Sequence, residues 1–205
     1  MPKIVDKRKK KEQILEEAMK VFAQKGFYNT KIIDIAEKAK IGKSTVYEYF
    51  NNKEDILNDA FNLLFHKSEQ LIKEAMGNGI SPEKKLVLLF KTSLISFLEQ
   101  SVQYKEIIIE FWANGIQNKN NGYPPLINLE SFYDPFRKTI ISLLNEGTHI
   151  GSFRSINIKI TADIFIVLFD GFILHWIRGN NPGNLNQSVD TLLEIVFSGI
   201  RKSRE

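Results

Sequence analysis

The chain has 205 residues, of which 43% are hydrophobic, with 28 Lys and Arg against 24 Asp and Glu and no cysteine. A chain of this length buries enough apolar surface for one large or two small domains. The absence of cysteine excludes disulfides, thiolate catalysis and zinc sites with sulfur ligands. The histidines, His66, His149 and His175, match no metal-binding spacing, so we expect neither a metal nor a cofactor.

Charge is distributed unevenly along the chain. Residues 1–53 hold 13 basic and seven acidic residues, a net charge of +6, whereas residues 54–205 hold 15 and 17, a net charge of −2. A basic N-terminal part is suited to a polyanion such as nucleic acid, although a solvated basic tail has the same charge.

No apolar export segment follows the basic N-terminus. The most apolar stretch, residues 160–177, contains Asp163, Asp170 and His175, each of which is costly in lipid. We therefore expect a cytoplasmic protein, without membrane association, in which this stretch is a buried helix.

Apolar spacing predicts an all-α fold of about nine helices and no strand. The first helix, over residues 7–25, ends at Gly26 and buries one face, formed by Ile14, Leu15, Ala18, Val21 and Phe22. A second helix begins after a Thr30 cap and buries Ile32, Ile33, Ile35, Ala36 and Ala39. A break at residues 40–42 leads to a short third helix that ends at Phe50.

The remaining helices are marked by caps and breaks. Asn52 and Asp55 resemble a capping box that opens a fourth helix, and Ser81 with Pro82 starts a fifth that ends near Gln100. Four more helices are expected: one over residues 103–116, one that ends at Gly147, one over residues 157–178 and one over residues 186–202. A loop is expected at residues 119–125. Pro135 either kinks its helix or occupies the first turn.

The change in charge near residue 53 predicts two domains, residues 1–52 and residues 53–205. The second contains 17 of the 23 aromatic residues and is large enough to enclose a ligand. In the first, residues 30–50 form two helices joined by a short turn, which is typical of a helix-turn-helix. Packing Ile41, Val46 and Phe50 inward leaves a polar outer face of Lys43, Ser44, Thr45, Tyr47, Glu48 and Tyr49.

Residues of this outer face have the chemistry for reading DNA. Lysine and hydroxyl side chains reach phosphates and bases, and Lys31 and Lys53 lie in or beside the same helices. Glu48 either accepts a hydrogen bond from a cytosine amino group or points to solvent.

The segment from Phe22 to Leu57 resembles the N-terminal DNA-binding region of the TetR/AcrR transcriptional regulators. The matching elements are Phe22-Ala-x-x-Gly26, Thr30, Ile35-Ala36-x-x-Ala39, Thr45-Val46-Tyr47-x-Tyr49-Phe50 and Lys53-Glu-Asp-Ile-Leu57. The resemblance implies that Thr30 and Lys53 anchor phosphates and that Tyr47 contacts the DNA backbone. It also implies that bases or nearby phosphates meet Lys43, Ser44, Thr45 and Tyr49.

Two residues depart from the family pattern. The family usually has Gly where Lys40 stands and Ser where Gly42 stands. A left-handed residue other than Gly costs about 1 kcal/mol, and a Gly cap lacks the hydroxyl that begins the recognition helix. Neither departure should abolish the fold.

The resemblance further implies that the C-terminal helices bind a small effector and form a homodimer. The last two helices have apolar faces adequate for a four-helix dimer seam, although an ordinary monomer core has the same pattern. These faces comprise Ile160, Ile164, Val167, Leu168, Gly171 and Leu174 in one helix and Val189, Leu192, Leu193, Val196 and Ile200 in the other.

Aromatic residues are the candidates for the effector site, or for plain core: Phe90, Phe97, Tyr104, Phe111, Trp112, Phe136 and Phe169. Glu110 is a carboxylate among aromatic residues, which suits a lipophilic cation, or it faces solvent. Asp170 and His175 are either ligand contacts or hydrogen-bonding groups at the dimer interface.

These patterns predict a dimeric DNA-binding transcriptional repressor that a small hydrophobic or aromatic ligand releases from a palindromic operator. A helical lipid-binding or partner-binding module without DNA activity is the alternative. We expect no enzyme, because the sequence has no catalytic residue set, phosphate-binding loop or metal motif.

Overall fold

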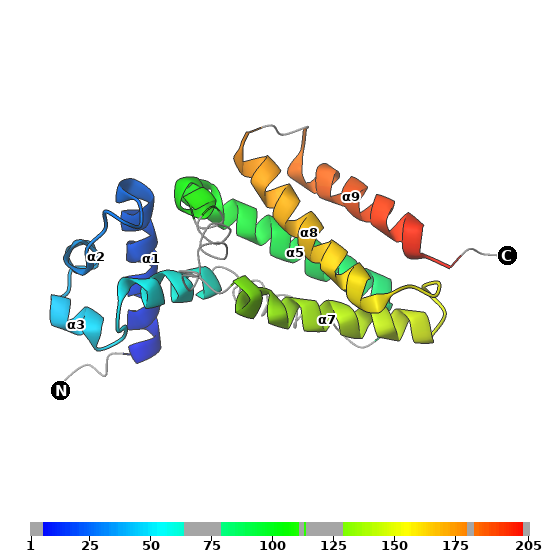
Figure 1. Cartoon of the computed structure of the whole chain (residues 1–205), viewed down its shortest axis with the longest axis horizontal. Helices are drawn as coiled ribbons and strands as arrows, with labels where there is room; N and C mark the ends of the chain where they lie inside the picture. The colour runs from blue at the N-terminus through cyan, green and yellow to red at the C-terminus, as the bar shows by residue number, and fades with distance from the viewer. Residues whose placement is uncertain (1–5, 64–78, 111–112, 114–128, 180–182, 203–205) are drawn as a thin grey trace. The chain divides into compact units, whose positions relative to one another are not determined.

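The computed structural model describes residues 6–63, 79–110, 113, 129–179 and 183–202. Within these residues the chain is helical, with no strand and one isolated antiparallel bridge between Phe153 and Arg201. The helices are α1 (Lys7–Lys25), α2 (Ile32–Lys38), α3 (Lys43–Tyr47), a helix over 53–63, α5 (Pro82–Ser101), the 3-10 helix η1 (Val102–Tyr104), a helix over 105–110, α7 (Leu129–His149), α8 (Ile158–Ile177) and α9 (Leu185–Ile200) (Figure 1). The predicted all-α fold is confirmed.

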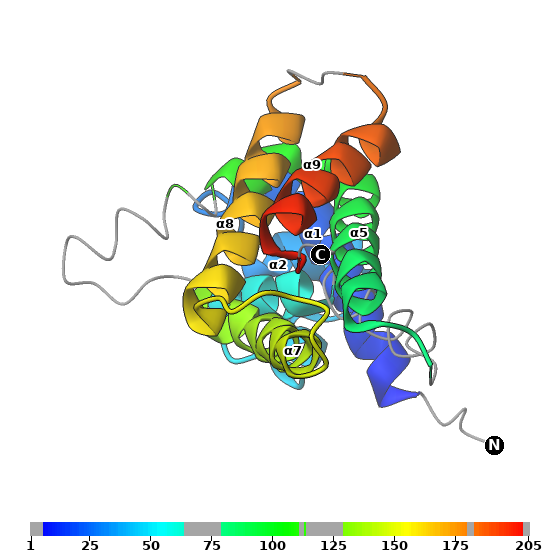
Figure 2. The same cartoon turned by 90° about the vertical axis from the view of Figure 1, so that its right-hand side faces the viewer.

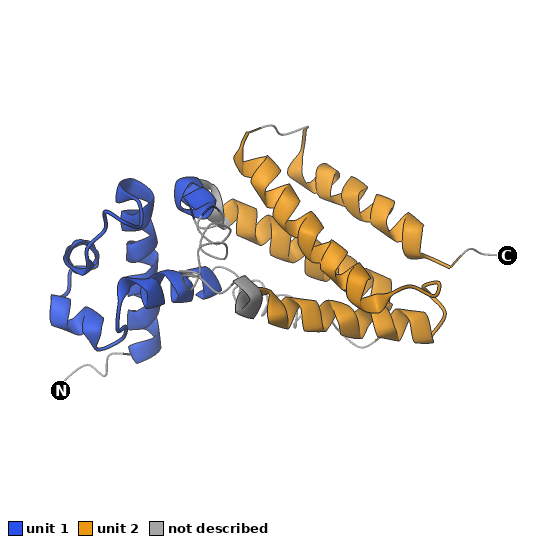
Figure 3. Cartoon of the chain, viewed as in Figure 1, with its two compact units in different colours: residues 1–66, 100–129 blue, residues 67–99, 130–205 orange. Residues whose placement is uncertain are grey.

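Packing divides the chain into two compact units, which Figure 3 colours separately. Unit 1 comprises residues 1–66 and 100–129, and unit 2 comprises residues 67–99 and 130–205. Unit 1 therefore contains η1 and the helix over 105–110 in addition to the N-terminal helices. The predicted functional division at residues 52 and 53 stays a prediction, because packing units and functional units need not coincide.

Helix α1 has the predicted bounds because strong local signals mark both ends. The Asp6 carboxylate accepts hydrogen bonds from the backbone N–H groups of Arg8 and Lys9, at 3.1 and 3.4 Å. Gly26 ends the helix in a positive-φ conformation, with φ of +74°, that favours glycine. The apolar face predicted for this helix is buried throughout.

Helix α2 begins one residue later than predicted. Its cap is Lys31, whose backbone N–H donates to the Asp34 carboxylate at 2.7 Å. The Thr30 hydroxyl instead donates to the Gly26 carbonyl at 2.7 Å, because Thr30 is buried in the preceding turn. The predicted face is also only partly correct, since Ile33 is 42% exposed.

The third and fourth predicted helices are both present, but the third is shorter than predicted. Helix α3 ends at Tyr47, three residues before the predicted end, although Phe50 is buried as expected. Asn52 caps the helix over 53–63 as predicted, because its side-chain oxygen accepts from the Asp55 N–H at 2.6 Å. The inner face of that helix buries Ile56 and Phe61.

Unit 2 consists of α5, α7, α8 and α9 packed around a shared aromatic core (Figures 1 and 2). Ser81 and Pro82 start α5 as predicted, with the Ser81 hydroxyl accepting from the Lys84 N–H at 3.4 Å. Phe165 of α8 lies 5.9 Å from Phe90 of α5 and 6.0 Å from Phe197 of α9, measured between ring centroids. These ring contacts join three of the four helices.

Helix α7 contains Pro135 in its interior, so the predicted alternative in which Pro135 occupies the first turn is wrong. The helix also continues beyond Gly147, its predicted end, to His149. Gly147 is required here by packing, since a Cβ at this position would lie 2.2 Å from the ring of Phe153. Glycine therefore permits a close approach within the helix and does not terminate it.

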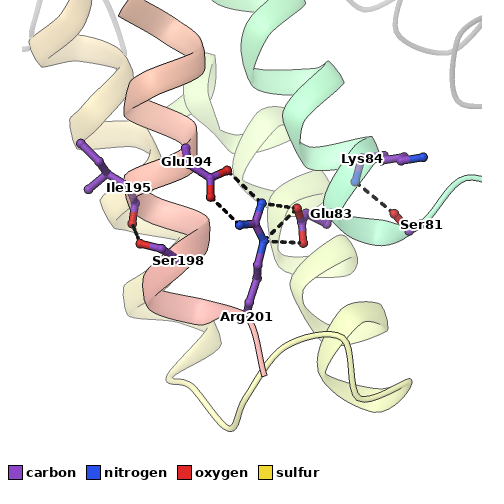
Figure 4. Close-up of polar contacts among 7 residues, drawn as sticks. All are labelled: Ser81, Glu83, Lys84, Glu194, Ile195, Ser198 and Arg201. Atoms are coloured by element: carbon purple, nitrogen blue, oxygen red, sulfur yellow. Dashed lines mark hydrogen bonds and ion pairs between the residues drawn. The ribbon is translucent and has the colours of Figure 1, made fainter. Parts of the chain in front are cut away.

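The end of α9 is tied to the start of α5 by one guanidinium group (Figure 4). Arg201 donates to the Glu83 carboxylate of α5 and to the Glu194 carboxylate of α9, each at a shortest distance of 2.7 Å. Hydrogen bonds to these carboxylates raise the pKa of Arg201 above its ordinary value, so the group stays charged. These hydrogen bonds fix the end of α9 against the start of α5.

Helix α8 is long and apolar enough to cross a membrane, the one such helix in the described part of the chain. It is less enclosed than predicted, since 28% of its most apolar 18-residue window is buried. Phe165 and Phe169 are nevertheless core residues of unit 2, and Asp163 forms an ion pair with Arg137 of α7 at 2.9 Å. These contacts are those of a helix packed within a helical domain.

Candidate nucleic-acid interface and effector site

The turn between α2 and α3 sets the direction of the recognition helix. The Ile41 N–H donates to the Ala36 carbonyl at 3.0 Å and the Lys40 N–H to the Glu37 carbonyl at 3.1 Å, the pattern of a Schellman motif. Lys40 occupies the left-handed position of this motif with φ of +55°. The predicted left-handed residue is therefore confirmed, and it lacks the glycine that this conformation favours.

Helix α3 presents a polar face while its inner face is packed. Val46 is fully buried and Phe50 nearly so, whereas the side chain of Tyr47 is 49% exposed. The Lys43 ammonium lies 5.8 Å from the centroid of the Tyr47 ring. The remaining residues predicted to face outward are exposed, Ser44 and Glu48, or half-buried, Thr45 and Tyr49.

Two residues expected at phosphates take part in internal contacts. The Lys53 ammonium donates to the carbonyls of Phe27, Tyr28 and Thr30 at 2.7, 3.1 and 3.1 Å. It also lies 4.4 Å from the centroid of the Phe27 ring. Thr30 is 2% exposed. Both residues hold the turn between α1 and α2, and their contact with phosphate stays a prediction.

Glu110 and Tyr104 belong to unit 1, whereas four of the candidate phenylalanines of the effector site belong to unit 2: Phe90, Phe97, Phe136 and Phe169. The Glu110 carboxylate accepts from the Phe27 N–H at 3.2 Å, in the same turn that Lys53 contacts. Burial raises the pKa of Tyr104, which packs near Lys20 of α1. The structure thus places these two residues beside the N-terminal helices.

The phenylalanines predicted for the effector site come together in unit 2 around Phe169. The ring centroid of Phe169 lies 5.7 Å from Phe90, 6.5 Å from Phe97 and 5.5 Å from Phe136. Their close mutual packing is that of a core. Phe111 and Trp112 lie outside the described residues, and His175 is exposed on α8.

A groove on the other face of α5 was not found from the sequence. Its volume is about 860 Å³, within the range of small-molecule sites. Its surface is mostly apolar, although only four of its lining residues are apolar and two are lysines: Ile80, Lys84, Val87, Leu88, Lys91, Thr92, Ile95, Ser96 and Glu99. The groove residues recur every three or four positions along α5, which is a signal for a second face of this helix. The predicted effector site was instead based on the aromatic residues of the first face.

Comparison with known proteins identifies the family. Residues 14–60, which include α2, α3 and Lys53, match the model of the bacterial regulatory proteins of the tetR family. This N-terminal segment belongs to the TetR family. The chain is therefore a DNA-binding transcriptional regulator, and the resemblance noted in the sequence is confirmed.

Relatives of this regulator align along nearly its whole length. The HTH-type transcriptional repressor KstR2 of Mycolicibacterium smegmatis is 25% identical over 206 residues, covering 95% of this chain and 92% of that protein. The fatty acid metabolism regulator protein of Bacillus subtilis is 20% identical over 195 residues, covering 95% and 97%. The solved structure of the transcriptional regulator FadR from Bacillus subtilis in complex with stearoyl-CoA matches with a TM-score of 0.76 at 20% identity, covering 92% of this chain and 98% of that chain. This likeness confirms the fold.

The positive-φ residue in the turn between α2 and α3 gives a first prediction. Replacing Lys40 with Gly should raise the free energy of unfolding by about 0.5–1 kcal/mol, because Gly adopts a positive φ without the Cβ clash. Lys40→Ala, the control, keeps the Cβ and should bring no gain. Urea denaturation measures both, and equal stability of the two variants would contradict the prediction.

Asp170 is half-buried beside the aromatic core, where its carboxylate accepts a hydrogen bond from the Tyr133 hydroxyl. Burial raises the pKa of Asp170 to about 6. Between pH 4 and 6 the folded state therefore binds more protons than the unfolded state, and the stability contributed by this group falls as pH rises through that window.

Asp170→Asn keeps an acceptor for Tyr133 and removes the charge. At pH 7 we expect it to raise the free energy of unfolding by roughly 1 kcal/mol, less than the full shift implies because the group is partly hydrated. The gain should disappear at pH 4, as measured by denaturation at both pH values. Asp163→Asn, on the exposed side of α8, is the control and should bring no gain at pH 7; the same gain in both variants would exclude Asp170 as the source.

Proposed function

We propose that the chain is a cytoplasmic, homodimeric repressor that binds a palindromic operator and is released when a long-chain acyl-CoA occupies its C-terminal domain. Residues 1–52 read DNA, and residues 53–205 bind the effector and form the dimer. The observation that carries the proposal is the polar outer face of α3, held by a buried inner face within the segment that matches the TetR family.

The exposure of individual side chains supports a division of roles. Lys43, Ser44, Tyr47 and Glu48 are exposed on α3 and free to enter a major groove, with Lys31 exposed at the cap of α2. Thr45 and Tyr49 reach DNA from half-buried positions. Thr30 and Lys53 act indirectly, by holding the turn that precedes α2.

The groove on α5 supports an acyl chain as effector. Its wall is mostly apolar, which suits a hydrocarbon chain, and Lys84 and Lys91 supply ammonium groups for the phosphates of CoA. Lys91 is paired with Asp190 of α9 at 2.7 Å, so a bound phosphate would compete with that carboxylate. The known complex of Bacillus subtilis FadR with stearoyl-CoA adds weight to this ligand class.

The outer faces of α8 and α9 support a homodimer. Ile160, Ile164 and Val167 of α8 and Ile195 of α9 are large apolar side chains with 47–68% of their surface exposed. They recur at spacings of three and four residues, so on α8 they form one continuous stripe. A second copy of the chain would bury this stripe in a four-helix seam.

DNA binding is tested by selecting bound sequences from a random duplex pool and measuring affinity by a mobility-shift assay. We expect a palindrome to be recovered and Tyr47→Ala or Lys43→Ala to weaken its binding by at least about tenfold. Ile33→Ala, which shortens another exposed side chain of the same domain, should leave affinity within about twofold. Ligand uptake without any selected sequence would favour a lipid-binding module instead.

The effector is tested by adding stearoyl-CoA to the operator complex. We expect release by stearoyl-CoA and no release by free CoA, because the acyl chain supplies the apolar contact. Ile95→Glu places a charge in the groove at a half-exposed position, so this variant should bind the operator but resist release. Release of the variant at the wild-type concentration would exclude the groove as the site.

A further inference from the structure

Five consecutive basic residues open α1 and have no part in the interface described above. This basic segment, Lys7 to Lys11, lies outside residues 14–60, which match the family model. Its first three residues are exposed, and the side chain of Arg8 is 83% exposed. The helix N-terminus itself is occupied by the Asp6 carboxylate, so what the segment offers to a partner is its side chains.

Most of the positive charge of the basic segment is not neutralised. Arg8 pairs with Glu12 at 3.0 Å, and Lys11 pairs with Asp59 at 2.6 Å. Lys10 contacts the neutral amide of Gln13 at 3.2 Å. In the described part of the chain, Lys7, Lys9 and Lys10 have no carboxylate within ion-pair distance. Three ammonium groups are thus available to a polyanion.

The basic segment adjoins the DNA-reading helix within unit 1. The Lys11 ammonium lies 5.3 Å from the centroid of the Phe50 ring, and Phe50 follows α3 after three residues. Lys7 lies one helical turn before Lys11 on the same face, about 6 Å further along α1. The basic segment therefore extends from the neighbourhood of Phe50, just after α3, toward the start of α1.

We propose that Lys7, Lys9 and Lys10 bind backbone phosphates of the operator beside the groove that α3 enters. The inference rests on the proposed DNA-binding function and extends its contact surface. An ammonium on a flexible stem neutralises phosphate without reading bases, so these residues add affinity and salt dependence but no sequence preference. DNA is favoured over an anionic membrane surface because the segment adjoins α3.

The test is the full-length triple variant Lys7→Gln, Lys9→Gln, Lys10→Gln. Affinity is measured from 50 to 200 mM salt on the selected duplex and on a scrambled duplex. Each phosphate contact contributes about 0.9 to the slope of log affinity against log salt, so loss of three should reduce the slope by about 2–3. At 50 mM salt we expect at least tenfold weaker binding to both duplexes, with their affinity ratio unchanged.

The matched control removes the same charge from exposed lysines of unit 2, with Lys138→Gln, Lys159→Gln and Lys202→Gln. Its slope should stay within about 0.5 of wild type. The inference would be overturned by an unchanged slope in the triple variant of the basic segment. It would also be overturned by an equal reduction of the slope in the control, or by a changed ratio of the affinities for the two duplexes. Equal wild-type affinity for both duplexes would instead overturn the sequence-specific function, while the slopes still report on the basic segment. Wild type that binds neither duplex would overturn both.

Discussion

Gly147→Ala is expected to lower the free energy of unfolding by about 2–3 kcal/mol. The new Cβ would lie 2.2 Å from two ring carbons of Phe153. That ring is buried and stacked on Phe197 at 6.2 Å between centroids, and Phe197 in turn contacts Phe165, so the ring has no free space to enter. Overpacking therefore outweighs the gain of about 1 kcal/mol that Ala normally brings to a helix.

The matched control for this substitution is Gly199→Ala in α9. Among the described residues outside its own helix backbone, no atom lies within 4 Å of the position of its Cβ, so stability should stay the same or rise by up to about 1 kcal/mol. Chemical denaturation at one protein concentration measures both variants, since the proposed dimerisation would link stability to concentration. Phe153→Leu should relieve most of the cost of Gly147→Ala; a cost that persists in that background would show that the ring is not its cause.

Lys53→Met is expected to lower the free energy of unfolding by about 1.5–3 kcal/mol, the range for hydrogen bonds to a charged group. Its ammonium joins the helix over 53–63 to three carbonyls of the turn between α1 and α2. Methionine retains the stem but donates no hydrogen bond. DNA affinity should fall at every salt concentration with an unchanged salt slope, because the loss acts through the position of α2 and α3.

Lys31→Met separates the structural role from phosphate binding. Lys31 is exposed, and its contribution to the α2 cap comes from the backbone N–H, so stability should change by less than about 0.5 kcal/mol. Its DNA affinity should fall with a slope reduced by about 0.9, as for one lost phosphate contact. A reduced slope with unchanged stability in Lys53→Met would return Lys53 to the phosphate-binding role that the family resemblance implies.

Helix ends were predictable where the signal is a neighbouring residue. Asp6 and Gly26 bound α1, Ser81 and Pro82 begin α5, and Asn157 caps α8 through a hydrogen bond to the Ile160 N–H at 3.1 Å. Each depends on residues within one helical turn. The start of α2 was misplaced because Thr30 is the better cap by residue type, but its hydroxyl donates to the Gly26 carbonyl and Lys31 takes the cap position.

The recognition face was predictable for the same reason. Burial of Val46 and Phe50 determines which side chains of a short helix remain outside, and spacing alone reveals those two. The proposed effector site was not predictable in this way. Tyr104 and Glu110 follow Phe97 closely in the sequence, yet they belong to a different unit from Phe97.

The sequence itself determined four features: the uneven charge, the absence of cysteine, the helical spacing and the TetR-like motif. Each depends on residue types or on the order of residues close together in the chain. Tertiary structure alone decided that Lys53 binds three carbonyls, that Gly147 makes room for Phe153 and that the outer face of α5 forms a groove. These features depend on contacts between residues far apart in the chain. Such contacts exist only once the helices have packed, so no local pattern encodes them.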